Sequence, residues 1–356
     1  MDIICSWHVE SFLSHPVTFV GILSMIREKT VVEGLLLGMG NPLLDISATV
    51  DQEFLKKYDL KANNAILAEE RHKSLYEELI ELYSANFIAG GSVQNTMRVA
   101  QWFLEKPKIA TYMGCVGKDK YSKILEERAV ADGLNVRYQY TDKEPTGTCA
   151  VLITGKERSL CANLAAANCF TTSHIEVPEN KELIQAAEYI YISVSTVTII
   201  SLTLLSLHLI MIKKITIVVF ADALPYVDIL FGNETEADTF AKANDFKTTD
   251  RKEIALKISK LDKINKNRKR IVVITQGSEP ILVARDDKIT EFPVTRIPEE
   301  NVIDTNGAGD AFVGGFLAQL IQGKDIETCL KCGIWAATQI VQTSGCTYKG
   351  KPDFKP

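Results

Sequence analysis

The chain has 356 residues, of which 46% are hydrophobic and 24% are charged, and its formal net charge is −5. This length is ample for one large domain or two, and the composition fits a soluble globular protein. Because a negative net charge provides no general positive field, nucleic acid is not expected as a partner.

Eight cysteines are scattered along the chain without the close pairs of a disulfide framework, which favours a reducing cytoplasm. Cys329 and Cys332 are the one tempting pair. They lie in a helix-like segment with no second pair nearby, so we expect neither a metal site nor a redox site there.

Strand-like and helix-like segments alternate from residue 35 onward, after residues 1–34, which carry no recognisable motif. Acidic residues and the absence of a clear cleavage site argue against a targeting peptide in that first stretch. We expect strands at 35–37, 43–50, 109–113, 136–140, 148–154, 159–162, 189–193, 227–231, 271–275, 281–284 and 289–294. We expect helices at 69–83, 92–105, 121–132, 181–187, from 233 onward, 311–320 and 326–342.

This alternation predicts an α/β fold with a mostly parallel central sheet, helices on both faces, and ligands at the carboxyl ends of the strands. No linker separates independent domains, so residues 35–356 are expected to form one unit. Short strands with polar turns at about 42–62 and 136–163 predict a small sheet standing apart from the main one.

One uncharged segment raises the alternative of a membrane span. Residues 189–212 contain no Asp, Glu, Lys or Arg, and 24 residues are enough to cross a bilayer. The segment is rich in Ser, Thr and β-branched residues, however. A buried strand, a helix and another buried strand in a parallel sheet would give the same pattern, and we favour that interpretation over a membrane span.

The segment 304–310 reads Asp-Thr-Asn-Gly-Ala-Gly-Asp and leads from an extended run into the apolar helix at 311–320. Gly307 and Gly309 leave little side chain over the backbone, and the first N–H groups of a helix attract phosphate oxygens. Asp310 adds a carboxylate that could accept a hydroxyl proton. Phosphoryl transfer needs this equipment, although a glycine-rich helix start with a dipole-satisfying acid would look the same.

Several motifs in one order resemble those of the ribokinase-like carbohydrate kinase family, and within it the adenosine kinases. Two are signature segments, Ala-Gly-Gly-Ser-Val-Gln-Asn at 89–95 and the segment at 304–310. The resemblance runs from about residue 36 to residue 354. The other segments that carry it lie at 38–47, 145–150, 162–168 and 227–236.

The resemblance implies that Asp310 is the general base that takes a proton from the 5′-hydroxyl of adenosine while that oxygen attacks the γ-phosphorus of ATP. It also implies an anion hole made by the amides of Gly307, Ala308 and Gly309. Asn233 and Glu236 match the family's magnesium-related pair, with Glu236 ordering water around the Mg²⁺ that accompanies ATP. The same spacing is a helix capping box, which is the alternative interpretation.

The remaining carried-over positions concern the ligands. Asp45 is expected to accept hydrogen bonds from the ribose 2′- and 3′-hydroxyls, and Arg158 to lie near the transferred phosphate. The other nucleoside positions are Asn41, Leu43, Gly91, Ser92, Asn95 and Cys149. Thr275, Gly277 and Asn306 are expected near the nucleotide. The family further implies a monomer with a small lid, located in the cytoplasm and possibly the nucleus.

The chain departs from the family between Tyr191 and Pro225, where it is shorter and lacks the segment that supplies an aromatic pocket wall. We expect this difference to lower stability and to open the adenine side of the site. Three hypotheses therefore remain: an active adenosine kinase, a nucleoside-binding relative that does not turn over, and a membrane-anchored protein. A sugar kinase of the same family is a further alternative.

Overall fold

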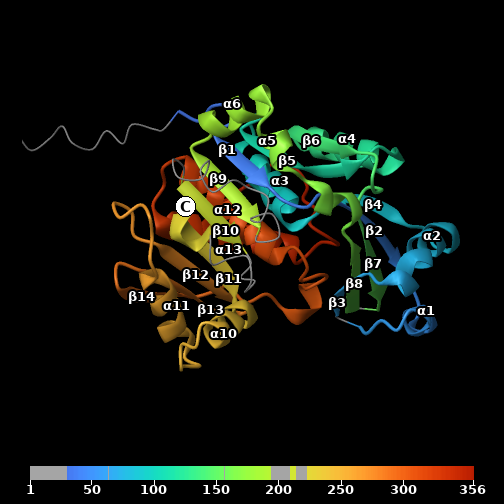
Figure 1. Ribbon diagram of the computed structural model, residues 1–356. Coiled ribbons are helices and arrows are strands. Elements are labelled where there is room, and N and C mark those ends of the chain that lie inside the picture. The colour runs from blue at the N-terminus through green and yellow to red at the C-terminus, as the bar shows by residue number, and fades with distance from the viewer. Residues whose placement is uncertain (1–29, 63, 156, 194–208, 214–222) are drawn as a thin grey trace, which may run out of the picture.

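The computed structural model describes residues 30–62, 64–155, 157–193, 209–213 and 223–356. Nine strands form one sheet in the order β14-β13-β12-β11-β10-β9-β1-β5-β6 (Figure 1). All neighbours from β12 to β6 are parallel, and β13 and β14 are antiparallel at one edge. The strands are β1 (Leu36–Met39), β5 (Ala110–Gly117), β6 (Asn135–Thr141), β9 (Tyr189–Ser193), β10 (Leu209–Lys213), β11 (Val227–Asn233), β12 (Ile271–Gln276), β13 (Glu279–Arg285) and β14 (Lys288–Phe292).

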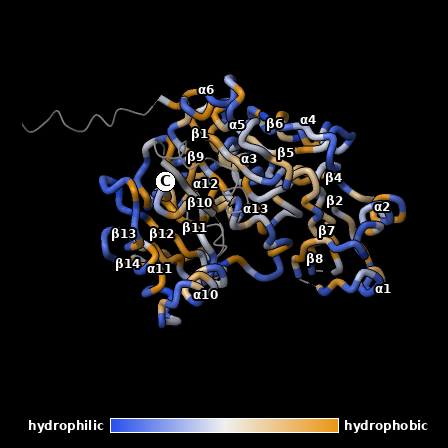
Figure 2. The backbone as a smooth tube through the Cα atoms, in the orientation of Figure 1, coloured by the Kyte–Doolittle hydropathy of each residue, from blue (hydrophilic) through white to orange (hydrophobic). Residues whose placement is uncertain are grey.

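Helices cover both faces of this sheet because successive strand residues point to opposite sides. Val272 belongs to one hydrophobic core and Val273 to the other. The first core is closed by α5 (Thr172–Ile175), α6 (Pro178–Ala186), α10 (Glu234–Ala243) and α11 (Arg251–Lys260). The second is closed by α3 (Ser92–Leu104), α4 (Lys120–Ala131), α12 (Ala308–Ile321) and α13 (Ile326–Ile340). Figure 2 shows hydrophobic backbone segments in the central strands, with hydrophilic ones toward the periphery.

A second sheet of five strands, ordered β3-β8-β7-β2-β4, forms a small lobe beside the large one (Figure 1). Two helices, α1 (Gln52–Lys57) and α2 (Lys73–Leu82), cover one of its faces around a separate core that includes Ile46 and Leu152. Asp45 and Ser47 alternate with Ile46 along β2 and therefore point to the other face. The strands are β2 (Leu43–Thr49), β3 (Ala65–Leu67), β4 (Asn86–Gly90), β7 (Thr148–Thr154) and β8 (Glu157–Asn163).

The structure confirms the α/β class, the mostly parallel sheet and the additional small sheet. It corrects the composition of that small sheet. The strand expected at 136–140 is β6, which pairs in parallel with β5 at the edge of the large sheet. Its Tyr138 is buried and packs edge-on against Tyr112, so the alternating polar residues mark a half-exposed edge strand rather than a separate sheet. Strands β3 and β4, outside 42–62 and 136–163, take part instead.

The uncharged segment 189–212 contributes two neighbouring parallel strands, β9 and β10, to the interior of the large sheet. Among the described residues, no helix is long and apolar enough to cross a membrane. Most of the departure between residues 191 and 225, namely 194–208 and 214–222, lies outside the described residues, as do residues 1–29 of the N-terminal stretch.

Arg270 fixes the chain where it enters β11. Its guanidinium is 2% exposed and donates to the carbonyl oxygens of five residues. The acceptors are Leu224, Val227, Ile258, Leu261 and Asp262, at 2.7 to 3.2 Å. One side chain therefore joins the segment before β11 to the end of α11.

We expect Arg270→Met to lower the free energy of unfolding by roughly 3–5 kcal/mol, because several buried carbonyl groups lose their donor. Urea denaturation measures this change. Arg285→Met, at an exposed arginine paired only with its neighbour Asp286, is the matched control and should change stability by less than about 0.5 kcal/mol. Equal midpoints for the two variants would contradict this role of Arg270.

Candidate active site

Helix α12 begins at the glycine loop, which comprises residues 304–309. Gly307 caps the helix with φ 81°, a left-handed conformation that favours glycine, and Asp310 stands in the first turn. The Asp310 side chain is almost buried and accepts hydrogen bonds from Ser92 Oγ at 2.8 Å and from Asn95 Nδ2 at 3.1 Å. Because both donors come from the start of α3, two helices far apart in sequence fix one carboxylate.

Arg98 fixes the orientation of Asn95. It lies one helical turn further along α3, and its Nη1 donates to Asn95 Oδ1 at 3.3 Å and to Ala89 O at 2.8 Å. Its Nε donates to Asp132 Oδ2, so hydrogen bonds fix the guanidinium at both Nε and Nη1. The Asn95 amide oxygen therefore faces Arg98, which leaves its amino group for Asp310.

Asp45 enters the same region from the small lobe. A Cβ atom on Gly90 would lie 2.2 Å from Asp45 Oδ1, and one on Gly91 would lie 2.3 Å from the carbonyl oxygen of Asn41. Both glycines are therefore required by close approach rather than by turn geometry alone. The two glycines let β2, with Asp45 and the preceding Asn41, pack directly onto the start of α3.

Burial between the lobes raises the pKa of Asp45 from 3.8 to about 7, because it disfavours the charged form. The positive charges of Arg158 and Arg98 oppose this rise, while the negative charges of Asp310 and Asp304 add to it. Two acidic groups and two guanidinium groups therefore influence one carboxylate at this junction of the lobes.

Arg158, on β8 of the small lobe, reaches the glycine loop. Its Nη1 donates to Asp304 Oδ2 at 2.5 Å, and side-chain exposures of 9% and 1% make this a buried ion pair. Its Nη1 also donates to Ser344 Oγ at 3.3 Å and its Nη2 to Ser47 Oγ at 3.4 Å. The arginine expected beside the transferred phosphate thus lies at the glycine loop, bound to an acid that the sequence did not single out.

Asn233 and Glu236 form a capping box at the start of α10. Asn233 Oδ1 accepts from Glu236 N at 2.8 Å, and Glu236 Oε2 accepts from Asn233 N at 2.9 Å. Both residues also line a cavity of about 170 Å³ together with Gly307, Gly309 and Asp310. The pair is therefore a helix capping box, as the alternative interpretation predicted. Its place in the wall of the small cavity is also compatible with a role near Mg²⁺.

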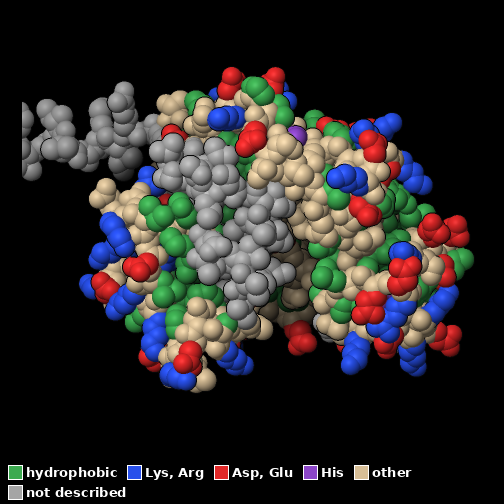
Figure 3. Space-filling model, in the orientation of Figure 1, with side chains coloured by type: hydrophobic (Ala, Val, Ile, Leu, Met, Phe, Trp, Pro, Cys, Tyr) green, Lys and Arg blue, Asp and Glu red, His purple; other side chains and the backbone are tan. Residues whose placement is uncertain are grey.

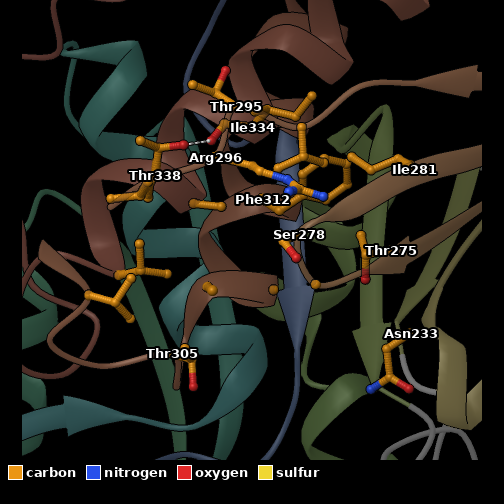
Figure 4. Close-up of a pocket in the computed structure, with 18 of the residues that line it drawn as sticks. Asn233, Thr275, Ser278, Ile281, Thr295, Arg296, Thr305, Phe312, Ile334 and Thr338 are labelled. Atoms are coloured by element: carbon orange, nitrogen blue, oxygen red, sulfur yellow. Dashed lines mark hydrogen bonds between the residues drawn. The ribbon is translucent and has the colours of Figure 1, made fainter. Parts of the chain in front are cut away.

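A larger cavity, of about 780 Å³, adjoins the small one and shares Asn233, Thr275, Gly309 and Phe312 with it (Figure 4). Thr275, Gly277 and Ser278 border it where β12 ends, and Ala308 and Gly309 where α12 begins. The apolar part of its wall includes Ile281, Val294, Ile297, Val302, Phe312, Ile334, Ala337 and Val341. In Figure 4, Thr338 donates to Ile334 O at 2.8 Å along α13. A ligand with a flat apolar ring and attached phosphates could place the ring against this apolar wall. Its phosphates would then lie at the start of α12.

The other positions named from the sequence lie around this framework. Leu43 begins β2 close to Gly147, and Cys149 is buried on β7, directly opposite Asp45 in the pairing of the strands. Asn306 donates from its backbone and side-chain nitrogens to Asp304 Oδ1 and is not among the residues lining either cavity. The structure thus brings Ser92, Asn95 and Asp310 into direct contact and places the rest nearby.

The analysis of the sequence missed Arg98, Asp304 and the apolar wall contributed by α13. For Arg98 a signal existed, because it follows Asn95 by three residues and must lie on the same face of a helix. No comparable signal connects Asp304 to Arg158, which are 146 residues apart.

Carboxyl ends of parallel strands, a helix start with bare amides and a fixed carboxylate define a phosphotransferase-type site on an α/β sheet. Residues 52–353 match the model of a family described as the pfkB family of carbohydrate kinases. The chain belongs to this family.

Within this family, the similar proteins described next are adenosine kinases. The chain is 49% identical to adenosine kinase 2 of Arabidopsis thaliana, over 90% of this chain and 98% of the relative. It is 38% identical to the adenosine kinase of Dictyostelium discoideum, over 88% and 96%. Among solved structures, an Anopheles gambiae adenosine kinase in complex with P1,P4-di(adenosine-5) tetraphosphate is similar with a TM-score of 0.84 and 51% identity, covering 91% of this chain and all of that one.

The raised pKa of Asp45 has a consequence for stability. Because the folded chain binds this proton more tightly than the unfolded chain, the contribution of Asp45 is largest below pH 4 and is lost as the pH rises through about 7. We expect Asp45→Asn to raise stability at pH 8 by roughly 2 kcal/mol, allowing for partial solvent exposure, and to change it little at pH 4.

Thermal unfolding between pH 4 and pH 8 measures the difference. Asp353→Asn, at an exposed carboxylate near the C-terminus, is the control and should leave the pH profile unchanged. A difference between Asp45→Asn and the unmodified chain that is the same at both pH values would contradict the expected ionisation.

Proposed function

We propose that this chain is an adenosine kinase, which transfers the γ-phosphoryl group of ATP to the 5′-hydroxyl of adenosine and forms AMP for purine salvage. The observation that carries the proposal is the Asp310 carboxylate, held by Ser92 and Asn95 at the start of a glycine-capped helix. It lines the small cavity, and the large cavity adjoins this one at Gly309.

The ligand of the similar Anopheles protein supports a site with two adenosine positions joined by phosphates. This ligand carries an adenosine at each end of four phosphates, and that protein is 51% identical to this chain. Here, one adenosine would lie between the lobes near Asp45, and the other in the large cavity beside α13. The phosphates would then cross the glycine loop at Asp310.

Asp310 acts as the general base in this proposal. The hydrogen bonds from Ser92 and Asn95 fix the carboxylate in position, so that it accepts the 5′-hydroxyl proton as the oxygen attacks phosphorus in line. The amides at Gly307, Ala308 and Gly309 face the negative charge on the migrating group. Ala308 N is held by a long bond of 3.3 Å to Thr305 O, which a phosphate oxygen can replace.

Asp45 and Asn41 would hold the nucleoside. A carboxylate can accept from the 2′- and 3′-hydroxyls together, and Leu43, Gly91 and Cys149 would form the walls around the ribose and base. Thr275 and Gly277 would border the bound ATP, and Asn306 would support the glycine loop through its bonds to Asp304. Arg158 would lie within reach of the transferred phosphate from the small lobe.

The donor set fits Mg²⁺ bound mainly through ATP. Among the described residues no cluster of three or more His, Cys, Asp or Glu side chains could hold a metal by itself. Mg²⁺ keeps several waters and takes phosphate oxygens, and when bound it offsets the charge of the phosphates. Glu236 would order its water from the wall of the small cavity, with its carboxylate held by the backbone N–H of Asn233 at 2.9 Å.

The direct test is ATP-dependent phosphorylation with adenosine, ribose and fructose compared. We expect turnover with adenosine, and at least tenfold lower kcat/KM for 2′-deoxyadenosine, because Asp45 then loses one donor. Equal rates with ribose would favour the sugar kinase alternative. Adenosine binding without turnover would favour the non-catalytic relative.

Asp310→Asn should lower kcat by about 10²–10⁴-fold, because the amide cannot take the proton. Adenosine should still bind, since Asp45 and Asn41 are unchanged, and titration calorimetry would show this. Ser92→Ala removes the Ser92 donor to Asp310 and leaves that of Asn95, so it should cause a smaller loss. A near-normal kcat in Asp310→Asn would eliminate Asp310 as the base.

A further inference from the structure

Asp304 begins the glycine loop, and both oxygens of its carboxylate accept hydrogen bonds at the junction of the lobes. Its side chain is 1% exposed and protein donors occupy both oxygens, so it does not itself contact a substrate. Its Oδ2 accepts from Arg158 Nη1 at 2.5 Å and from Gly345 N at 2.8 Å. Its Oδ1 accepts from Asn306 N at 3.0 Å and from Asn306 Nδ2 at 3.1 Å.

These four donors come from three parts of the chain. Arg158 belongs to β8 in the small lobe, Gly345 to the turn after α13, and Asn306 to the glycine loop itself. The backbone of Asp304 is fixed as well, since its N donates to Val341 O at 3.1 Å. A single carboxylate thus joins the small lobe, the C-terminal segment and the loop that precedes Asp310.

The bonds to Asn306 determine the shape of the loop just before its glycines. They turn the chain at Asn306, so that Gly307 enters the left-handed conformation and caps α12. Gly307 is also close to the C-terminal turn, because a Cβ atom on it would lie 3.1 Å from Cys346 Cβ. The amides that would face the phosphates are therefore positioned through Asp304 and the turn that Gly345 belongs to.

We infer that Asp304 is a positioning residue for phosphoryl transfer, because it sets the glycine-loop amides in place and ties that arrangement to the small lobe through Arg158. This inference rests on the proposed kinase function. When the small lobe is seated, Arg158 and Gly345 saturate one oxygen, and the other oxygen holds Asn306. Loss of either side frees the loop and the amides move relative to Asp310.

The carboxylate charge is needed, and not only its shape. Asparagine at this position has one acceptor oxygen, whereas the four donors approach two oxygens from opposite sides. Whichever way the amide is oriented, its NH₂ group meets either Arg158 and Gly345 or the two nitrogens of Asn306. One of the two connections must therefore break in Asp304→Asn.

The test compares the unmodified chain, Asp304→Asn and Asp325→Asn. Asp325 is the matched control, an aspartate that caps α13 through Thr328 N at 2.7 Å away from the junction. We expect Asp304→Asn to lower kcat by about 10²-fold, since displacements of about 1 Å cost this much in phosphoryl-transfer geometry. The Kd for adenosine measured without ATP should stay within about threefold, because Asp45 and Asn41 are untouched. Asp325→Asn should stay within about twofold in both.

Hydrogen–deuterium exchange provides a readout that needs no turnover. In Asp304→Asn without nucleotide, we expect faster exchange at residues 305–309 and 157–163, with unchanged exchange in β11 and β12. Arg158→Lys is the second variant, which keeps the positive charge but loses the forked donors. It should show the same exchange signature with a smaller loss of kcat.

Three outcomes would overturn the inference. The first is a kcat of Asp304→Asn within about threefold of the unmodified chain. The second is a loss of activity matched by an equal loss of adenosine-binding stoichiometry, which would mean that the variant only misfolds. The third is exchange at 305–309 that neither variant changes. If the unmodified chain does not phosphorylate adenosine, the proposed function fails, while the exchange experiment still decides the role of Asp304.

Discussion

The site depends on one constraint, which is that the Asp310 carboxylate is held from another helix. Ser92 and Asn95 lie more than 200 positions earlier in the chain, yet both donate to it. The contact requires α3 and α12 to meet at their first turns, and they can do so because both pack on the same face of the large sheet. The sheet therefore sets the place and the angle of the acid before any ligand is bound.

The second requirement is that two lobes meet at this acid. In Figure 3 the lobes are separated by a hollow at the lower edge of the view, with charges of both signs spread over their outer surfaces. Asp45 and Arg158 come from the small lobe, whereas Asp304 and Asp310 come from the large one. Acidic and basic side chains of both lobes lie close together here. The pKa of Asp45 therefore depends on Arg158 of its own lobe and on Arg98, Asp304 and Asp310 of the large lobe.

Much of this arrangement is readable in the sequence, because it follows from local chemistry. The helix beginning at Ser92, the strand 148–154, the hairpin ending the sheet and the glycine cap of α12 all follow from periodicity and turn residues. Pairing partners are not local, and so the sequence placed residues 136–140 in the wrong sheet and did not connect Arg158 with Asp304. The large cavity was also missed, because its apolar wall on α13 looks like any helix that covers a sheet.

Arg270 holds the start of β11 by bonds that do not involve the segment leading into Leu224. Two of its five carbonyl acceptors, Leu224 and Val227, hold the backbone just ahead of β11 and at its first residue. A change of length upstream of Leu224 would leave these contacts of Arg270 in place, and we therefore expect it not to shift β11, its terminal Asn233 or α10. A segment of different length grafted there should therefore leave the register of β11 with its neighbouring strand β12 unchanged.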